Sequence, residues 1–344
     1  MFVKLGCFKI CAIDAYIVGQ GVRMGKVVLL AGGGGHTSYA YALAQHLDGK
    51  CEIESIVPEG DELSYAKLKR FGLVNTLPKP RGPKTSLAPF LAGLGVSLIR
   101  SSSLKLGSDT ITVSTGSNFC VSPCIKAWTK GSPIINIESS VRLVKPSKTA
   151  KYLYRIASLT ALQWPEQKEF FPKGEVFGPI FARKEIEARN DGYVLVTGGT
   201  YGHKSLIETL DATGLENVFL QAGPHYSPEY VKKHPSWKVI PYSDRFHEII
   251  AGASVVVTHL GDTVLESALV YGKPTIIVLN PEWTRTGGPE DARILAKKIN
   301  VILLEQLTAK DLLEAIERAP TIKIRSTTNG AELLSKRLLE MLRV

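Results

Sequence analysis

Two short stretches of the sequence combine glycines with side chains that could do chemistry. The first is Gly32–Thr37, in which four glycines precede His36. Glycine lets the backbone approach a ligand closely, and the free N–H groups at the start of a following helix attract an anion. His36 titrates near neutral pH and can accept a proton from a hydroxyl group. It could equally cap the helix or donate to a phosphate, so the pattern alone leaves its role open.

The second stretch runs from Thr258 to Glu266, where an apolar strand is followed by a glycine turn and the start of a helix. Thr263 and the first N–H groups of that helix could bind a phosphate. The carboxylate of Glu266 could bind a vicinal diol such as that of ribose. Ordinary helix capping by Asp262 and Thr263 would explain the same residue types. Both interpretations stay open at this point.

The elements around these stretches follow one plan that occurs twice. A strand over Lys26–Leu30 runs into the first glycine stretch and a helix over Ser38–Leu47. A strand over Tyr193–Thr197 runs into Gly198, Gly199 and Thr200, and then into a helix near Lys204–Leu210. The first glycine loop is not followed by the Gly-Lys-Ser/Thr of a Walker A loop, and it lacks the third glycine of the dinucleotide fingerprint. Strand, glycine turn and helix open a βαβ unit, so the repetition predicts two Rossmann-like domains of an α/β protein.

Further apolar runs predict the remaining strands. Continuous runs such as Val255–Val257 suit strands of a parallel sheet that is buried on both faces. The expected strands are Cys51–Val57, Thr110–Ser114, Ile134–Ile137 and Ala161–Gln163, then Val218–Gln221, Lys238–Pro241, Val255–Thr258, Thr275–Leu279 and Val301–Leu304. We expect an N-terminal extension over 1–23, a first domain over 24–182, a second over 190–325 and a C-terminal amphipathic helix within 329–344.

Positive charge is concentrated in the first half of the chain. Residues 1–184 carry 24 Lys and Arg against 12 Asp and Glu, whereas residues 185–344 carry 18 against 20. Inside the basic half, Thr85–Ile99 is an apolar segment flanked by basic residues and too short to span a bilayer. Such a segment is typical of a helix lying in the membrane interface, although a buried connecting helix would look similar. The expected membrane contacts are Lys79, Arg81, Lys84, Phe90, Leu94 and Arg100.

The cysteines and the first residues bear on compartment and cofactors. The five cysteines are an odd number, and residues 1–23 make a poor secretory signal, so we expect reduced thiols in the cytoplasm. Cys120 and Cys124 form a lone pair, which is a weak indication of a metal site, and we expect no metal and no cofactor. Met24 precedes a strong strand, so residues 1–23 could be a dispensable extension.

Several motifs resemble a known enzyme family. The stretch Ser114–Phe177 resembles the membrane-recruiting subunit of the eukaryotic UDP-N-acetylglucosamine transferase that adds the second sugar to dolichyl diphosphate. The matching pieces are Cys120–Cys124, Ile137–Ser139, Arg142 and Gln163-Trp164-Pro165-Glu166, followed by Gly178. Residues 193–300 resemble the catalytic subunit, through Val196–Thr200, Gln221–Gly223, His259–Glu266 and Gly272–Pro274. The chain thus resembles a fusion of both subunits and, more distantly, the bacterial transferase of the peptidoglycan lipid precursor.

This resemblance implies a GT-B glycosyltransferase, with two Rossmann-like domains facing a cleft and peripheral attachment to the inner face of the cell membrane. It implies metal-independent, inverting transfer of N-acetylglucosamine from UDP-GlcNAc to a polyprenyl (dolichyl) diphosphate-linked sugar, giving a β-linked disaccharide for N-glycan or related synthesis. The implied catalytic residues are His36 as base and Glu138 as a second acid–base or positioning residue. The implied acceptor loop is Gly33, Gly34, Gly35 and Thr37. The implied donor site comprises Gly198, Gly199, Thr200, Gly223, Phe246, His259, Gly261, Asp262, Thr263, Glu266, Glu290 and Asp291.

Two departures from the family pattern bear on the donor. Asp262 stands where a small residue is expected, and a carboxylate beside a diphosphate is unfavourable. Glu290 and Asp291 stand in place of a glutamine-containing segment and are expected to contact the donor sugar. Alternatives to the transferase are a UDP-GlcNAc epimerase of the same fold and a non-catalytic membrane-recruiting scaffold. Nucleic acid is not an expected partner, because the basic stretch has few interleaved aromatic residues.

Overall fold

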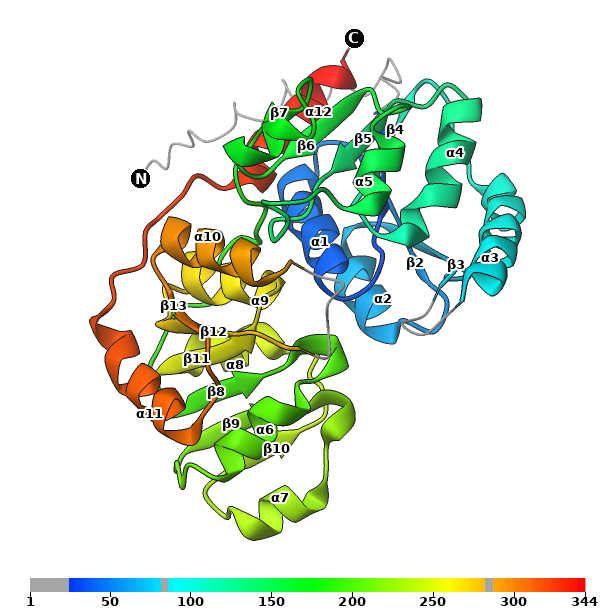
Figure 1. The fold of residues 1–344 in the computed structure, drawn as a ribbon. Helices are drawn as coiled ribbons and strands as arrows, with labels where there is room; N and C mark the ends of the chain where they lie inside the picture. Colours follow the sequence, from blue (N-terminus) through cyan, green and yellow to red (C-terminus); the bar gives the residue numbers. More distant parts are fainter. Residues whose placement is uncertain (1–24, 82–85, 282–286, 344) are drawn as a thin grey trace, which may run out of the picture.

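The computed structural model describes residues 25–81, 86–281 and 287–343, which form two lobes, each built on a parallel β-sheet (Figure 1). The sequence expectations for residues 1–23 and for Lys84 lie outside these residues. Both sheets alternate strands with helices, as predicted for an α/β protein.

The first lobe contains a seven-stranded parallel sheet in the order β3-β2-β1-β4-β5-β6-β7. Its strands are β1 (Lys26–Leu30), β2 (Glu52–Pro58), β3 (Leu73–Leu77), β4 (Thr110–Ser114), β5 (Ile134–Ile137), β6 (Leu159–Leu162) and β7 (Glu175–Val176). The central strands are buried along their length, which explains why their apolar runs predicted them correctly. The two edge strands were missed, because β3 is partly exposed and its apolar run is interrupted by Asn75 and Thr76, and β7 has only two residues.

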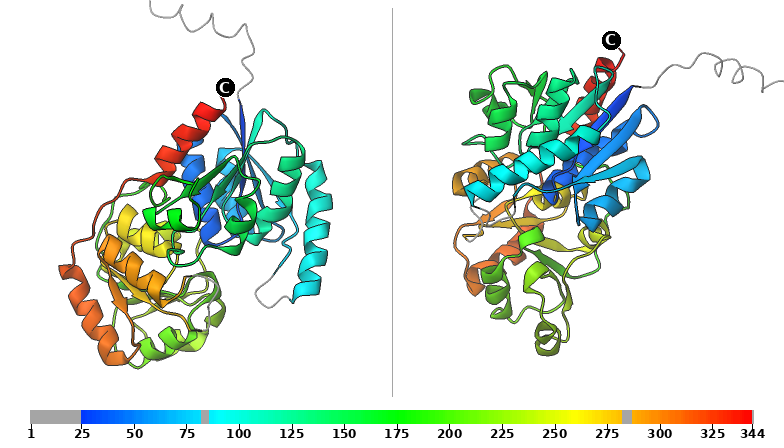
Figure 2. Two further views of the ribbon diagram at one scale, coloured as in Figure 1. Left: turned by 45° about the horizontal axis from the view of Figure 1, so that its top comes forward. Right: turned by 90° about the vertical axis from the view of Figure 1, so that its right-hand side faces the viewer.

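Helices cover both faces of this sheet. They are α1 (Gly35–Leu47), α2 (Glu62–Leu68), α3 (Leu87–Arg100), α4 (Val121–Thr129), α5 (Lys148–Leu153) and α12 (Gly330–Met341). Helices α1 and α12 share one hydrophobic core with the strands, and α4 packs in a core on the other face. Helix α3 lies on the outer side of α4, away from the sheet (Figures 1 and 2).

The second lobe contains a six-stranded parallel sheet in the order β10-β9-β8-β11-β12-β13. Its strands are β8 (Val194–Thr197), β9 (Val218–Gln221), β10 (Lys238–Ile240), β11 (Val255–His259), β12 (Thr275–Val278) and β13 (Ile302–Leu304). Its helices are α6 (Lys204–Asp211), α7 (Pro228–Lys233), α8 (Phe246–Gly252), α9 (Asp262–Leu265), α10 (Pro289–Ile299) and α11 (Ala309–Arg318). A π-helical turn, Glu266–Val270, continues α9.

The lobes are joined by more than the connecting segments. After α11 the chain returns to the first lobe, where α12 packs against α1 (Figure 1). A separate apolar cluster contains Val141, Leu143 and Trp164 from the first lobe together with Leu260 and Val264 from the second. Burial of apolar surface stabilises such a contact by roughly 25 cal/mol per Å². The two lobes therefore pack directly on each other. Among the described helices, none combines the length and apolarity that crossing a membrane requires.

Candidate active site

The glycine loops that follow β1 and β8 meet where the lobes contact each other. A β-carbon placed on Gly34 would lie 3.2 Å from Thr200 Oγ1, and one placed on Gly35 would lie 3.1 Å from Asp262 Cβ. Gly33 and Gly34 have φ values of +86° and +56°, which favour glycine. Each loop follows a central strand at the point where the strand order changes direction, which is where open α/β sheets bind ligands. The structure thus brings the predicted acceptor and donor loops together.

His36, in the first turn of α1, has a defined hydrogen bond. Its Nδ1 lies 2.6 Å from the carbonyl oxygen of Thr115, which follows β4. Because a carbonyl only accepts, Nδ1 carries the hydrogen and Nε2 carries the lone pair. Burial lowers the pKa of His36, and the charge of Lys79 acts in the same direction, while the bond to Thr115 opposes them. The ring is therefore neutral near pH 7 and can accept a proton at Nε2.

Thr37, predicted in the acceptor loop, and Lys79, predicted to contact the membrane, both have partners within the protein. The hydroxyl of Thr37 is buried and hydrogen-bonded to the Ser64 hydroxyl at 2.7 Å, so it is engaged within the protein. Lys79, expected to contact the membrane, instead places its ammonium group 3.3 Å from the carbonyl oxygen of Gly32. Long lysine side chains can reach a neighbouring loop, which sequence spacing does not reveal. The ammonium group of Lys79 therefore lies beside the first glycine loop.

Glu138 is fully buried, and each oxygen of its carboxylate accepts a hydrogen bond from a backbone N–H group. Oε1 accepts from the N–H of Ser139 at 2.6 Å and Oε2 from the N–H of Ser147 at 2.9 Å. Burial raises the pKa of Glu138 to about 7, against the effect of these hydrogen bonds. The geometry favours positioning over proton transfer, because the group holds both ends of the 138–147 loop.

The Gln-Trp-Pro-Glu motif supports the same loop. Trp164 Nε1 donates to the Ser140 carbonyl at 2.8 Å. Gln167, which sequence reasoning missed, donates from Nε2 to the carbonyls of Ser139 and Arg142, each at 2.8 Å. Gln167 directly follows the motif, but its burial, which marks its role, is visible only in the structure. The segment that begins at Glu138 and the Gln163–Gln167 segment are therefore connected by hydrogen bonds into one unit.

His259, at the end of β11, packs against the glycine loop Gly198–Thr200 that follows β8. A β-carbon on Gly199 would lie 2.4 Å from His259 Cε1, and one on Gly261 would lie 2.9 Å from Nε2. Burial lowers the pKa of His259 to about 4, with His203 acting in the same direction. The neutral ring fills the space that the two glycines leave open. Its position explains why both residues are glycine.

Two further side chains donate hydrogen bonds to the loop that follows β8, and the sequence analysis did not predict either of them. The Tyr242 hydroxyl donates to the Thr200 carbonyl at 2.9 Å, and Asn280 Nδ2 donates to the Gly202 carbonyl at 3.1 Å. Gly223, which was predicted, has a φ of +60° and lies near the Tyr242 hydroxyl. Asn280 comes two residues after β12, and a polar residue at the carboxyl end of a parallel strand could have marked it.

Asp262 faces the first lobe. Its side chain packs on Gly35 and interacts with Ser38, and within the described part of the chain its buried Oδ1 has no hydrogen-bond partner. Burial raises the pKa of Asp262 to about 7, and the charge of Glu266 acts in the same direction. A carboxyl group with this pKa is about half protonated at pH 7, which weakens the predicted conflict with a diphosphate. Thr263 follows it in α9, half-buried.

Three predicted donor contacts lie differently from the expectation. Asp291 is buried, and its oxygens accept from the N–H groups of Leu143 at 2.6 Å and Val144 at 2.8 Å and from Gly288 at 2.7 Å. It therefore ties α10 to the first lobe, and both of its oxygens already accept hydrogen bonds from backbone N–H groups. Glu290 is exposed and paired with Arg293 at 3.1 Å. Phe246 is partly buried in the core beneath α8.

Helix α3 presents an apolar face to solvent, but not through the residues expected. Phe90 and Leu94 lie on its half-buried side, where the guanidinium of Arg81 stacks over Phe90 and the Leu94 carbonyl accepts from Ser122. The most exposed apolar side chains are Leu87, Leu91 and Ile99, which are 70%, 57% and 74% exposed; Val96 and Leu98 are exposed as well, and Arg100 ends the helix. The error follows from helical phase, which the uniformly apolar segment could not define.

The described part of the chain contains no cluster of three His, Cys, Asp or Glu side chains placed to hold a metal ion. Cys51, Cys120 and Cys124 are free and buried there, and burial raises the pKa of Cys120 and Cys124. These three thiols pack within the protein interior.

Comparison with known proteins agrees with this geometry. Residues 193–336 match the glycosyltransferase family 28 C-terminal domain. A UDP-N-acetylglucosamine–N-acetylmuramyl-(pentapeptide) pyrophosphoryl-undecaprenol N-acetylglucosamine transferase of Salinibacter ruber is 24% identical over 230 residues, 60% of this chain and 61% of that protein. The match thus spans under two thirds of that relative. A transferase of the same description from Bacillus thuringiensis subsp. konkukian is 25% identical. This match covers 84% of the present chain and 89% of the Bacillus protein.

Solved structures share the fold. MurG of Acinetobacter baumannii superposes with a TM-score of 0.58 at 17% identity, over 92% of this chain and 98% of its own. A UDP-N-acetylglucosamine 2-epimerase superposes with a TM-score of 0.60 at 13% identity. This match covers 93% of the present chain and 95% of the epimerase chain. The chain therefore has the GT-B fold, as predicted, and its second lobe matches a glycosyltransferase domain.

Proposed function

We propose that this protein transfers N-acetylglucosamine from UDP-GlcNAc to a lipid-linked sugar with inversion at the anomeric carbon. The observation that carries the proposal is His36, a neutral histidine with its lone pair on Nε2, located where the two glycine loops meet. The match of residues 193–336 to a glycosyltransferase domain supports the reaction class. The names of the bacterial relatives support the donor sugar.

In the proposed reaction, His36 Nε2 accepts the proton of the acceptor hydroxyl. The hydroxyl oxygen forms a bond to C1 of the donor sugar while the bond from C1 to the diphosphate oxygen breaks, and UDP leaves. One attack inverts C1, so one base suffices and no enzyme nucleophile is needed. Backbone N–H groups at Gly198–Thr200 would stabilise the charge on the leaving diphosphate. Tyr242 and His259 hold this loop in shape before the substrate arrives.

The acceptor belongs to the first lobe in this proposal. Lys79 beside Gly32 places a positive charge at the first loop, which suits a diphosphate. The resemblance to the eukaryotic enzyme favours a dolichyl carrier and a role in N-glycan synthesis, whereas the relatives are named for an undecaprenyl carrier. Glu138, through the 138–147 loop, would position the acceptor and would not exchange its proton.

The exposed face of α3 is the proposed contact with the membrane that holds the acceptor. Leu87, Leu91 and Ile99 form its apolar part, and Trp128 on the neighbouring helix α4 is 58% exposed. Arg100 and Lys126 add positive charge beside it. An apolar helix with basic neighbours suits the interface of an anionic bilayer.

The decisive experiment is incubation of the full chain with UDP-GlcNAc and synthetic lipid diphosphate sugars that differ in carrier length and in first sugar. Product mass should increase by one N-acetylhexosamine, with and without EDTA. A reaction with UDP-GlcNAc alone tests the epimerase alternative, which would give an isomer of the donor. Absence of product together with absence of UDP binding by calorimetry would instead favour a scaffold.

A further inference from the structure

Asp262 belongs to the second lobe, and its side chain lies on the first lobe. It begins α9, and a β-carbon placed on Gly35 would lie 3.1 Å from Asp262 Cβ. Its carboxyl group also interacts with Ser38, three residues further along α1. The neighbours Leu260 and Val264 are buried in the apolar cluster that both lobes share. Asp262 is thus the ionisable residue in the turn through which the second lobe contacts α1.

The carboxyl group of Asp262 lies where a negative charge is unfavourable, because its buried Oδ1 has no hydrogen-bond partner within the described residues. The titratable groups that face it are Tyr39 of α1, Lys67 of α2 and Glu266 of the π-helical turn. Burial raises the pKa of Asp262 to about 7. In this pKa, the hydrogen bond from Ser38 and the charge of Lys67 oppose the rise, and the charge of Glu266 adds to it. The neutral carboxyl group therefore suits this contact better than the carboxylate does.

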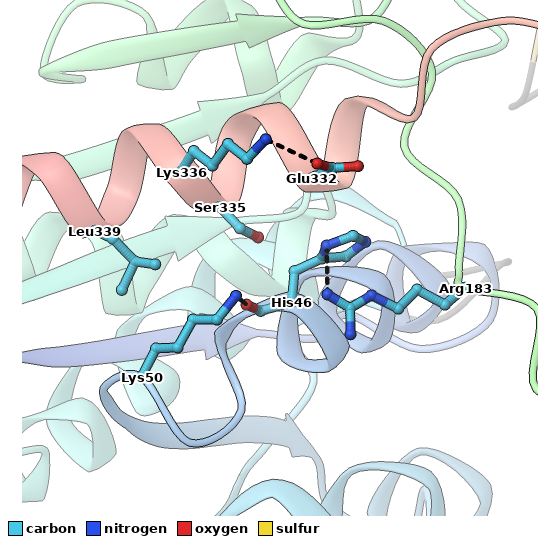
Figure 3. A pocket seen from close by; sticks show the side chains of 7 residues that line it. All are labelled: His46, Lys50, Arg183, Glu332, Ser335, Lys336 and Leu339. Atoms are coloured by element: carbon cyan, nitrogen blue, oxygen red, sulfur yellow. Dashed lines mark hydrogen bonds and ion pairs between the residues drawn. The ribbon is translucent and has the colours of Figure 1, made fainter.

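Helix α1 is held in the first lobe at its opposite end. Figure 3 shows that end, where His46 in the last turn of α1 lies beside Arg183 and helix α12. Arg183 Nη2 lies 3.0 Å from His46 Nδ1. Helices α1 and α12 also share the hydrophobic core of the first sheet. A separation of the lobes would therefore leave α1 in place and would break the contact at Asp262.

The same packing brings the two glycine loops into contact. A β-carbon placed on Gly34 would lie 3.2 Å from Thr200 Oγ1, so the side chain of Thr200 lies directly against the backbone of the first loop. A phosphate group placed between these two residues requires the loops to move apart. The arrangement of the lobes is thus a closed one, and Asp262 belongs to the contact that closes it.

We propose that Asp262 is a proton-controlled latch between the lobes, which stays closed while its carboxyl group is neutral and separates the two glycine loops when the group ionises. In the open arrangement the carboxyl group is in water, where its ordinary pKa is 3.8. The closed arrangement binds the proton more tightly, so its advantage is complete below pH 3.8 and is lost as pH rises to about 7. Between pH 6 and pH 8 the ratio of open to closed molecules should rise about tenfold. The latch concerns the lobes alone and does not depend on which substrate the cleft takes.

Peptide-resolved hydrogen exchange of the full chain between pH 6 and pH 8 tests the proposal, with each rate divided by the intrinsic amide rate at that pH. In the parent, protection of the peptides over residues 33–40 and 259–267 should fall about tenfold across this range, because exchange of the covered amides requires opening. Asp262→Asn keeps the shape without the charge and should stay equally protected throughout. Asp48→Asn replaces an exposed carboxylate at the other end of α1 and should behave like the parent.

Ser38→Ala gives a second test that leaves the carboxyl group unaltered. The Ser38 hydrogen bond favours ionisation of Asp262, so its loss should move the fall in protection to higher pH. The radius of gyration from small-angle X-ray scattering should rise with pH in the parent and stay constant in Asp262→Asn. The same pH dependence in Asp262→Asn would overturn the proposal, because it would then come from another group such as Glu138. Protection in the parent that does not change with pH would overturn it as well.

Discussion

The Nδ1 atom of His36 lies 2.6 Å from the carbonyl oxygen of Thr115 and joins the starts of two βα units at the contact between the lobes. This bond fixes which ring nitrogen can accept a proton. Replacement His36→Ala should therefore reduce kcat by about 10²- to 10⁴-fold, the usual contribution of a positioned base, with little change in the KM for the donor. His234→Ala, which removes a histidine paired with Asp211 in the second lobe, is the control.

The pH dependence of kcat/KM provides a second test of His36 as the base. The pKa of His36 is lowered, so kcat/KM should stay constant below the ordinary histidine value of 6.5 and decline only when lower pH protonates Nε2. An acid limb centred above pH 7, or near-normal turnover of the alanine variant, would remove His36 from the role of base.

Glu138 should make the free energy of unfolding depend on pH. Its pKa in the folded protein is raised to about 7, above the ordinary value of 4.5, so the unfolded chain releases the proton first. The protein is then most stable with respect to this group below pH 4.5 and loses up to about 3 kcal/mol as pH rises to 7. Urea unfolding at several pH values should show this slope, and Glu138→Gln should reduce it, while the part due to Asp262, whose pKa is also raised to about 7, should remain. The exposed Glu59→Gln should keep the parent slope.

Glu266 is the proposed ligand of the donor ribose. Replacement Glu266→Gln keeps the shape and removes the charge, so we expect about a tenfold increase in the KM for UDP-GlcNAc, equal to about 1.4 kcal/mol, with kcat within about twofold. Steady-state kinetics and calorimetry with UDP measure this. Unchanged affinity for UDP would show that Glu266 does not contact the nucleotide.

Asp291 should prove to be a link between the lobes. Replacement Asp291→Ala leaves the buried N–H groups of Leu143 and Val144 without an acceptor, at a cost of about 3 kcal/mol in the free energy of unfolding. Glu290→Ala, its exposed neighbour, should cost under about 1 kcal/mol, because surface ion pairs contribute little. Equal effects of the two variants in urea unfolding would contradict the assignment.

The sequence predicted local features well and long-range ones poorly. The glycine loops, His36 and the central strands follow from short patterns, since buried parallel strands are continuous apolar runs. The roles of Lys79 and Asp291 depend on which distant carbonyl or N–H group lies beside them, and this emerges only when the lobes pack. Tyr242 reaches Thr200 from another βα connection, so no spacing along the chain relates the two.

The exposed face of α3 should bind anionic bilayers. Replacing Leu91 and Ile99 together by glutamate adds two negative charges to this face and removes its apolar contact, so vesicle-bound protein should decrease at least tenfold in flotation with phosphatidylglycerol vesicles. Leu73→Glu is the control, because Leu73 is 60% exposed but belongs to the edge strand β3 and not to α3. Activity on a water-soluble acceptor should survive in the double variant, whereas activity on vesicle-embedded acceptor should decline with binding. Unaltered flotation of the double variant, or equal loss in Leu73→Glu, would refute α3 as the membrane contact.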